Sequence, residues 1–198
     1  SPHSPTRLYC AANKVFRSDD RGNSWQVISD DLTAMVDRDS LKFMDKYWSP
    51  DAVVKHVSTS QWGTIVSLDE SRVQEGLIYA GTDDGVISVT EDNGANWHQV
   101  SSFTNVPKYT YVSDVQAGKH SADVVFAAFQ NIKMDDFKPY LFKSTDKGRT
   151  WKSIIGNLPE NQSIHSVQQD HKNPNLLFAG TEMGIYFTIN GGKHWVKM

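Results

Sequence analysis

Short stretches in which apolar residues are interleaved with polar ones recur along the whole chain. Examples are residues 14–17, 140–143 and 151–155. Apolar positions that alternate with polar ones are typical of a β-strand with one buried face, whereas an amphipathic helix would need a period near 3.6 residues. The pattern therefore predicts a chain of short strands joined by turns.

One short phrase, which we call the turn motif, is repeated four times between these stretches. It consists of a hydroxyl residue, any residue, Asp or Asn, any residue, Gly, any two residues and Trp. Four of the 6 tryptophans stand in this frame, which chance does not plausibly produce. The motif residues are Ser18, Asp20, Gly22 and Trp25, then Thr90, Asp92, Gly94 and Trp97, then Ser144, Asp146, Gly148 and Trp151, and finally Thr188, Asn190, Gly192 and Trp195.

The residue types of the motif fit a hairpin turn. Glycine permits positive φ, and a short carboxylate, amide or hydroxyl group can accept hydrogen bonds from backbone N–H groups nearby. The tryptophan at the start of the return strand supplies a large apolar surface that can fold back over the hairpin. Turn chemistry accounts for every motif residue, so we interpret these aspartates as structural rather than catalytic or metal-binding.

The motif resembles the Asp-box, or bacterial neuraminidase repeat, of sialidases, sortilin-type receptors and two-propeller xyloglucanases. Stretches 14–25, 76–97, 136–151 and 173–195 carry the resemblance, which is closest to sortilin-type propellers of large secreted bacterial proteins, often labelled glycosyl hydrolases. In these families the box joins the third and fourth strands of a propeller blade and is structural. The resemblance implies an extracellular or periplasmic location.

The predicted fold class is all-β: a β-propeller of four-stranded antiparallel Asp-box blades. A second phrase, seen in residues 77–82 and 176–181, marks the second strand of each blade. We expect about four blades, the first incomplete, within one propeller segment of a larger ring. The expected divisions of residues 1–198 are a partial blade 1 (7–30), an insertion (31–62), blade 2 (63–103), blade 3 (109–157) and blade 4 (163–198).

The first blade starts at its second strand, so its sheet has an open edge. Such edges recruit other strands. We expect the rest of a parent propeller or self-association to cover this edge. The alternatives are a compact four-bladed ring completed by residues 52–57, and pairing with a second chain.

Composition narrows the possible partners. The net charge is −3 and the basic residues are scattered, which argues against nucleic acid. No apolar run approaches the roughly 20 residues of a membrane-spanning helix. The first residues resemble no signal peptide. The lone Cys10 is expected to be a buried small apolar residue.

The spacing between motif tryptophans locates two insertions. The first contains a possible short helix between Asp39 and Trp48, and the second covers residues 130–139. In an up-and-down blade, both insertions leave the rim opposite the turn motifs. In the resembling enzymes this rim is the ligand side, and loops on a rigid scaffold commonly carry function.

Candidate site residues are therefore sought on that rim. A glycosidase needs two carboxyl groups roughly 5 to 10 Å apart. Residues 83–85 are also interpretable as a type I′ turn and residues 135–136 as a solvated loop. The catalytic candidates are Asp83, Asp84, Asp135, Asp136 and Glu182, and the ligand-face candidates are His56, Trp62, Lys108, Tyr109, Tyr111, Lys138 and His165.

Two classes of function remain open. A module that binds a glycan or a peptide would use exposed aromatic residues, and we favour this binding or scaffolding role because no catalytic signature is recognisable. The alternative is a glycoside hydrolase of the sialidase or xyloglucanase kind. The arginine triad of a sialidase is not recognisable, and the histidines show no metal-ligand spacing, so no cofactor or metal is predicted.

Overall fold

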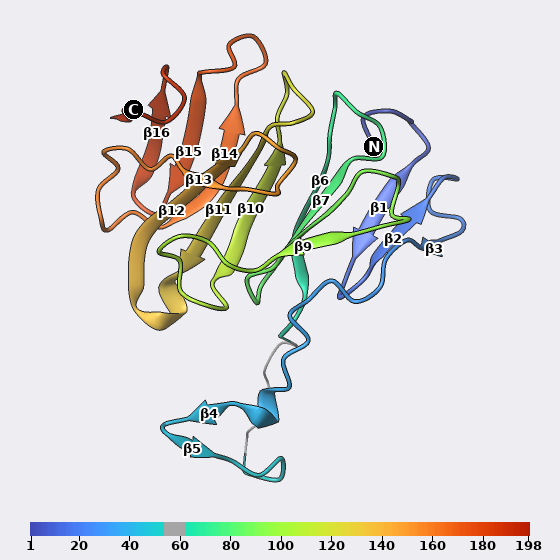
Figure 1. Ribbon diagram of the computed structural model, residues 1–198, viewed down its shortest axis with the longest axis vertical. Coiled ribbons are helices and arrows are strands. Elements are labelled where there is room, and N and C mark those ends of the chain that lie inside the picture. Colours follow the sequence, from blue (N-terminus) through green and yellow to red (C-terminus); the bar gives the residue numbers. More distant parts are fainter. Residues whose placement is uncertain (54–61) are drawn as a thin grey trace.

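The computed structural model describes residues 1–53 and 62–198. Four antiparallel sheets follow one another along the chain, and we call them blades 1 to 4 (Figure 1). The helices among the described residues are two single 3-10 turns, η1 (Arg38–Ser40) and η2 (Ile132–Met134), neither of which is long and apolar enough to cross a membrane. The all-β prediction is confirmed.

The blades differ in their number of strands. Blade 1 has three: β1 (Leu8–Ala11), β2 (Val15–Ser18) and β3 (Gln26–Val27). Blade 2 has β6 (Ile65–Glu70), β7 (Ile78–Thr82), β8 (Ile87–Thr90) and β9 (His98–Val100). Blade 3 has β10 (Tyr111–Ala117), β11 (Val125–Asn131), β12 (Asp136–Ser144) and β13 (Lys152–Ser153), and blade 4 has β14 (Ile164–Gln169), β15 (Leu177–Thr181), β16 (Gly184–Thr188) and β17 (Val196–Lys197).

The strand register repeats from blade to blade. In β6, β10 and β14, which we call the inner strands, the pairing with the second strand shifts by one residue near the start of the inner strand. After this shift Leu68, Val115 and Val167 each lie opposite an alanine of the second strand. Equivalent positions in different blades can therefore be compared directly.

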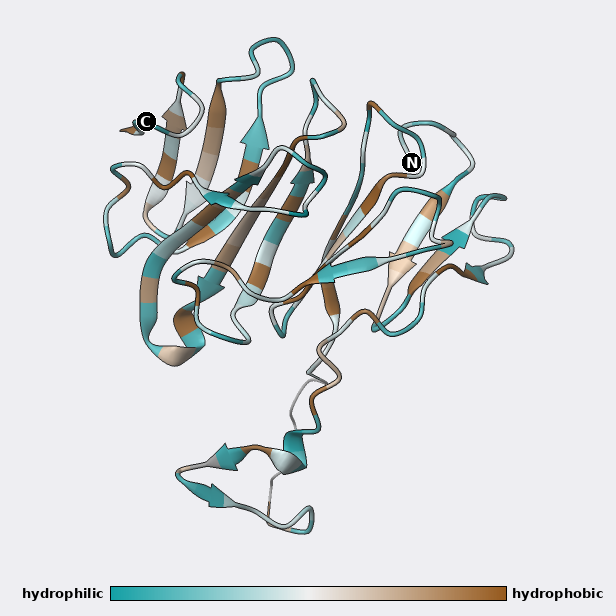
Figure 2. Cartoon of the chain, viewed as in Figure 1, coloured by the Kyte–Doolittle hydropathy of each residue, from teal (hydrophilic) through white to brown (hydrophobic). Residues whose placement is uncertain are grey.

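The hydrophobic core lies between successive blades. One cluster joins blades 2 and 3 through residues such as Tyr79, Phe129 and Phe142, all of them buried. A second joins blades 3 and 4 around Phe126 and Leu177, and a smaller one joins blades 1 and 2. Figure 2 shows the corresponding hydrophobic bands along the strands, whereas the connecting loops are mostly hydrophilic. Each blade is thus stabilised mainly by the faces of its neighbours.

Side chains of one inner strand also cap the backbone of the next. Ser67 Oγ and Asp69 Oδ2 of β6 accept hydrogen bonds from the amides of Val115 and Ala117, at 2.8 and 2.9 Å. One blade later, Asp114 Oδ2 and Gln116 Oε1 accept from the amides of Val167 and Gln169, at 2.9 and 2.8 Å. An inner strand is the edge of its sheet, so these bonds satisfy N–H groups that strand pairing leaves free.

The first insertion differs from its prediction. Between Asp39 and Trp48 the chain forms η1 and then a hairpin of β4 (Lys42–Phe43) and β5 (Lys46–Tyr47). The two turn residues, Met44 and Asp45, have φ of 51° and 62°, which suits a type I′ hairpin turn and ends any helix. The hairpin extends well away from the blades (Figure 1).

Two smaller expectations are also wrong. Residues 83–85 do not form a type I′ turn, because Gly85 is the one residue of the three with positive φ; it closes a three-residue hairpin loop instead. Cys10 is exposed rather than buried. It lies on β1, whose inner edge is not covered by a strand among the described residues.

Candidate ligand-binding rim

The turn motifs lie together on one rim of the molecule. In each blade the motif Asp or Asn is followed by a residue whose amide donates a hydrogen bond to a carbonyl of the segment before the second strand. In blade 4 this residue is Gly191, which follows Asn190. These bonds run from Arg21 to Thr6, from Asn93 to Gly76, from Lys147 to Asp123 and from Gly191 to Asn175, at 2.9 to 3.0 Å. The β4–β5 hairpin and the long β11–η2–β12 hairpin lie on the opposite rim (Figure 1).

All four motifs make the same internal hydrogen bonds. The hydroxyl group donates to the Asp or Asn side chain at 2.7 to 2.8 Å and accepts from the glycine amide, as in Thr90, Asp92 and Gly94. The same carboxylate or amide oxygen accepts the amide of the residue before the tryptophan. Hydrogen bonds from Ser24 and Ser18 lower the pKa of Asp20 to about 2. Each acid is thus fully engaged within its own turn.

The motif tryptophans do more than cover their own hairpins. Trp97 Nε1 donates to the Ile28 carbonyl of the preceding blade at 2.9 Å, and Trp195 Nε1 donates to the Ile154 carbonyl at 2.9 Å. Trp25 and Trp151 bond to the glycine carbonyls of their own turns. A Cβ on Gly94 would lie 2.3 Å from the Ile28 carbonyl oxygen, so this close approach requires glycine.

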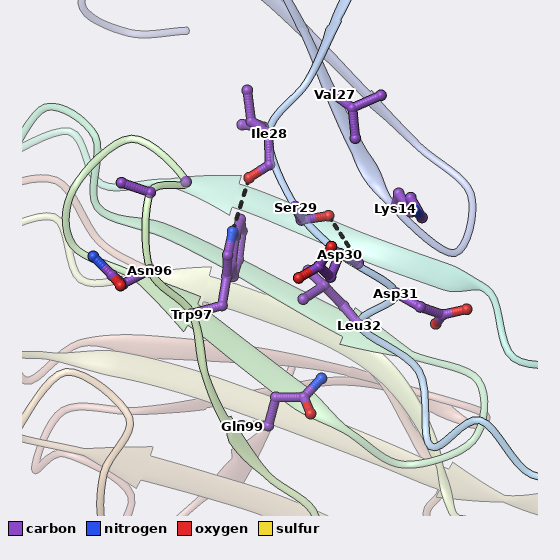
Figure 3. Close-up of a pocket in the computed structure, with 12 residues that line it drawn as sticks. Lys14, Val27, Ile28, Ser29, Asp30, Asp31, Leu32, Asn96, Trp97 and Gln99 are labelled. Carbon is purple, nitrogen blue, oxygen red and sulfur yellow. Dashed lines mark hydrogen bonds between the residues drawn. The ribbon is translucent and has the colours of Figure 1, made fainter.

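Trp97 also borders a hollow of about 630 Å³ between blades 1 and 2 (Figure 3). The hollow is lined by Lys14, by residues 27–32, and by residues 94–97 together with Gln99. In Figure 3 the indole reaches across to Ile28. The hollow is the outer seam between two blades, and none of the predicted ligand-face residues lines it.

Three predicted ligand-face residues come together on the opposite rim. The rings of Trp62 and Tyr109 meet edge to face with centroids 5.4 Å apart, and Lys108 Nζ lies 4.6 Å from the centroid of the Tyr109 ring. Both aromatic side chains are partly exposed. Trp62 also borders a hollow of about 450 Å³ whose wall includes Thr33, Met35 and Arg38. We call Trp62, Lys108 and Tyr109 the aromatic ridge.

Tyr109 is held in an unusual backbone conformation. Its φ is 65°, a region that non-glycine residues rarely adopt. A Cβ on Gly85 would approach Tyr109 Cα within 3.2 Å, so the loop of blade 2 packs directly against this backbone. Two loops that follow different strands therefore fix the position of the tyrosine.

Asp83 and Asp84 hold the first insertion against blade 2. Asp83 Oδ1 accepts the amides of Gly63 and Thr64 at 2.9 and 2.8 Å. Asp84, which is only 2% exposed, accepts the Ala34 amide at 2.8 Å and the Thr82 hydroxyl at 2.5 Å. Burial raises the pKa of Asp84. Both carboxylates are occupied by the protein's own backbone.

The candidates of the second insertion lie on the β11–β12 hairpin. Asp135 is exposed, with φ 59°, at the end of η2. Asp136 accepts the Tyr140 hydroxyl at 2.6 Å and the Asn131 amide at 3.2 Å. Burial opposes ionisation of Asp136, but these hydrogen bonds outweigh it and lower its pKa. Lys138 is exposed, and Tyr111 is partly exposed at the start of β10.

Two further candidates form a pair in blade 4. His165 Nε2 lies 2.6 Å from Glu182 Oε2, and both side chains are about half exposed. Among the described residues no group of His, Cys, Asp and Glu could hold a metal ion. His56, another predicted ligand-face residue, lies outside the described residues.

Sequence reasoning missed two acids on the inner strands. Asp69 and Asp114 line a polar hollow of about 210 Å³ together with Arg72, Lys119 and Gln168. Burial raises the pKa of both carboxyl groups. The sequence did contain a signal that could have identified these acids. Each inner strand has a polar residue at every second position, as in Ser67 and Asp69 or Asp114 and Gln116.

No family model and no curated protein matches this sequence. Solved structures do match: an ancestral GH74 enzyme superposes with a TM-score of 0.70 at 17% identity, over 100% of this chain and 23% of that one. The GH74 xyloglucanase from Xanthomonas campestris gives 0.65 at 21% identity, over 100% of this chain and 29% of that one. The β-propeller domain of Swd1 from Myceliophteria thermophila gives 0.61 at 12% identity, over 98% and 52%.

The fold is that of a β-propeller. The predicted fold class is therefore confirmed, including the short first blade. The chain covers less than a third of each GH74 enzyme. At these identities the similarity defines the fold alone.

Proposed function

We propose that this propeller segment is a carbohydrate-binding scaffold whose aromatic ridge stacks against sugar rings of an extended polysaccharide. The observation that carries the proposal is the pairing of Trp62 with Tyr109 beside a hollow of about 450 Å³. Aromatic rings present an apolar face to a sugar and a polar edge to water. The similarity to a xyloglucanase supports a polysaccharide as the ligand class.

The geometry around the ridge supports this role. Positive φ at Tyr109 is a local strain, and strain of this kind commonly persists where a side chain must be presented in one orientation. Lys108 beside the Tyr109 ring adds a hydrogen-bond donor for sugar hydroxyl groups. The ridge is thus a rigid apolar surface with a polar margin.

The alternative, a glycoside hydrolase, has weaker support. General acid catalysis needs a carboxyl group that can reach the glycosidic oxygen. Asp83, Asp84 and Asp136 already accept hydrogen bonds from the protein, and Glu182 is paired with His165. The GH74 neighbours are the observation that keeps hydrolysis as a second candidate.

Further parts of the proposal concern the motif and the location. The shared hydrogen bonds of the four turns support their assignment as structural Asp-boxes of the sialidase and sortilin kind. The residue divisions given above then describe successive blades of one propeller. An extracellular or periplasmic location suits a polysaccharide ligand.

Titration of the full chain with xyloglucan oligosaccharides, followed by calorimetry, tests the proposal. Trp62→Ala and Tyr109→Ala should each weaken binding by about tenfold or more, since buried aromatic contacts are worth over 1 kcal/mol. Trp25→Ala is the matched control, because Trp25 is 44% exposed on the other rim. Equal losses in all three variants, or no binding by the wild type, would contradict the proposal. Release of reducing sugar ends that Asp135→Asn, a change at an exposed acid, abolishes would favour the hydrolase instead.

A further inference from the structure

Three consecutive residues of blade 2, Asp83, Asp84 and Gly85, lie behind the aromatic ridge. They belong to the loop between β7 and β8, and we call them the acidic loop. Each contacts a different part of the candidate site: the turn after Trp62, the segment before the β4–β5 hairpin, and the backbone of Tyr109. One short loop therefore supports the backbone that carries both rings of the ridge.

The Trp62 side of the ridge depends on Asp83. Asp83 Oδ1 accepts the amides of Gly63 and Thr64, at 2.9 and 2.8 Å. Gly63 has φ of 87°, a conformation that a residue with a side chain rarely adopts, so the chain turns directly after Trp62. The carboxylate of Asp83 thus holds the turn that determines where the indole lies.

The Tyr109 side of the ridge depends on Gly85. A Cβ on Gly85 would lie 3.0 Å from the Thr110 carbonyl oxygen and 3.2 Å from Tyr109 Cα. Thr110 is 1% exposed, and its hydroxyl donates to the Pro107 carbonyl at 2.7 Å. This bond closes the segment that carries Lys108 and Tyr109. A shift of the acidic loop would therefore displace the whole segment.

The hollow beside the ridge depends on Asp84. Its buried carboxylate accepts the Ala34 amide at 2.8 Å. Ala34 lies between Thr33 and Met35, and both of these residues line the hollow of about 450 Å³ that Trp62 borders. The acidic loop thus contacts the backbone next to both rings and next to the wall of the hollow.

Blade 4 shows that the propeller fold does not require this arrangement. The amide of Asp83 donates to the Thr64 carbonyl, and in blade 4 the amide of Glu182 donates to the Ser163 carbonyl. Glu182 therefore has the position of Asp83. Among the described residues its carboxylate is paired with His165 and accepts no backbone amide. The backbone bonds of the Asp83 side chain are thus an addition to the repeat, and they lie next to the ridge.

We infer that Asp83 is a positioning residue of the glycan site, because it joins the turn after Trp62 to the loop behind Tyr109 and so holds the two rings at one spacing. This inference rests on the proposed function, since it concerns the same ridge. An extended ligand that stacks on two rings binds best when their spacing is already set. Without the Asp83 carboxylate the two rings move independently, and part of the binding free energy is used to order them.

The first test needs no ligand. NMR cross-peaks between ring protons of Trp62 and Tyr109, whose centroids are 5.4 Å apart, report the contact. Asp83→Ala should remove these cross-peaks, whereas Asp83→Asn should keep them, because the amide oxygen of Asn can accept the same two hydrogen bonds. Asp170→Ala is the matched control, since Asp170 Oδ1 also accepts two backbone amides, at 2.8 Å each, but on the rim of the turn motifs. Unchanged cross-peaks in Asp83→Ala, or an equal loss in Asp170→Ala, would overturn the inference.

Asp83→Glu covers the case in which the alanine variant does not fold. Blade 4 is folded with Glu182 at this position, so the variant should keep the circular dichroism spectrum of the wild type. The longer side chain moves the carboxylate away from the amides of Gly63 and Thr64. The ring cross-peaks should therefore be lost, and their full retention in Asp83→Glu would contradict the positioning role.

The second test measures the binding of xyloglucan oligosaccharides by calorimetry. Asp83→Ala should weaken binding by about fivefold or more, whereas Asp83→Asn and Asp170→Ala should bind as the wild type does. In a Tyr109→Ala background, Asp83→Ala should have little further effect, because no ring spacing is left to preserve. Additive losses would refute the positioning role. Absence of binding by the wild type would contradict the proposed function, and the ring cross-peaks would still decide whether Asp83 sets the geometry of the ridge.

Discussion

Blade 1 and blade 4 are built from the same repeat, yet their motif tryptophans have different surroundings. Trp195 of blade 4 is 2% exposed and bonds to Ile154 of blade 3. Trp25 of blade 1 is 44% exposed and bonds only within its own turn. Blade 4 has a preceding blade among the described residues and blade 1 does not, which accounts for the difference in burial. The hydrogen bond alone does not mark the neighbour, since Trp151 of blade 3 also bonds within its own turn although it packs on the core between blades 2 and 3.

The same contrast holds along the inner strands. The amides of Val167 and Gln169 in blade 4 are capped by side chains of blade 3. The capping side chains of β6 and β10 therefore point to the inner strand of the following blade, although Gln169 of β14 also accepts the Lys119 amide of blade 3 at 2.7 Å. Within the inner strands the repeat is thus mainly directional, because the amides of β10 and β14 depend on side chains of the preceding blade.

Removal of the two tryptophans should give the largest difference. Trp195→Ala removes a fully buried indole and its bond to Ile154, so the free energy of unfolding should fall by about 3 to 5 kcal/mol. Trp25→Ala should cost below about 1 kcal/mol, because nearly half of the side chain already contacts solvent. Urea denaturation followed by circular dichroism measures both. Similar losses would show that the tryptophan acts mainly through its own hairpin.

The direction of the inner-strand bonds can be tested at one register position. Asp114→Ala removes the acceptor of the Val167 amide and should cost about 1 to 3 kcal/mol, whereas Asp114→Asn should restore most of this loss. Ser166 has the equivalent position in blade 4 but is exposed and caps no following blade. Ser166→Ala should therefore change stability by less than about 0.5 kcal/mol. Equal costs at the two positions would contradict a directional repeat.

The sequence predicted the fold well because the repeat is local. The order Ser, Asp, Gly, Trp defines a turn by short-range hydrogen bonds, and alternating strands on both sides define the blade. The bonds of Ser144, Asp146 and Gly148 need no distant partner. Strand count and blade order followed from these local signals.

The candidate site was only partly predictable, since it depends on contacts between distant segments. The aromatic ridge joins Trp62 to Tyr109, and nothing in either local sequence indicates the other. The sequence alone made Asp84 a plausible catalytic acid. The structure shows that its carboxylate accepts a hydrogen bond from the amide of Ala34, which lies near the start of the first insertion and far from Asp84 in the sequence. Asp69 and Asp114 were overlooked because the capping of a neighbouring strand has no local pattern beyond alternation.

The smallest expected effect concerns the motif acid itself, which is Asp20 in blade 1 and Asn190 in blade 4. Both side chains accept the same motif hydroxyl and backbone bonds, so Asp20→Asn should lose at pH 7 only the bond that Asp20 Oδ2 accepts from the Ser24 hydroxyl at 2.6 Å, a small cost at this exposed turn. The pKa of Asp20 is lowered to about 2, below the value of about 3.9 in an unfolded chain. Its stabilising contribution is therefore fully present above pH about 4 and is lost as the pH falls towards 2. Thermal melts between pH 2 and 5 should show a shallower acid decline for Asp20→Asn and a steeper one for Asn190→Asp, and parallel curves for all three proteins would disprove this assignment.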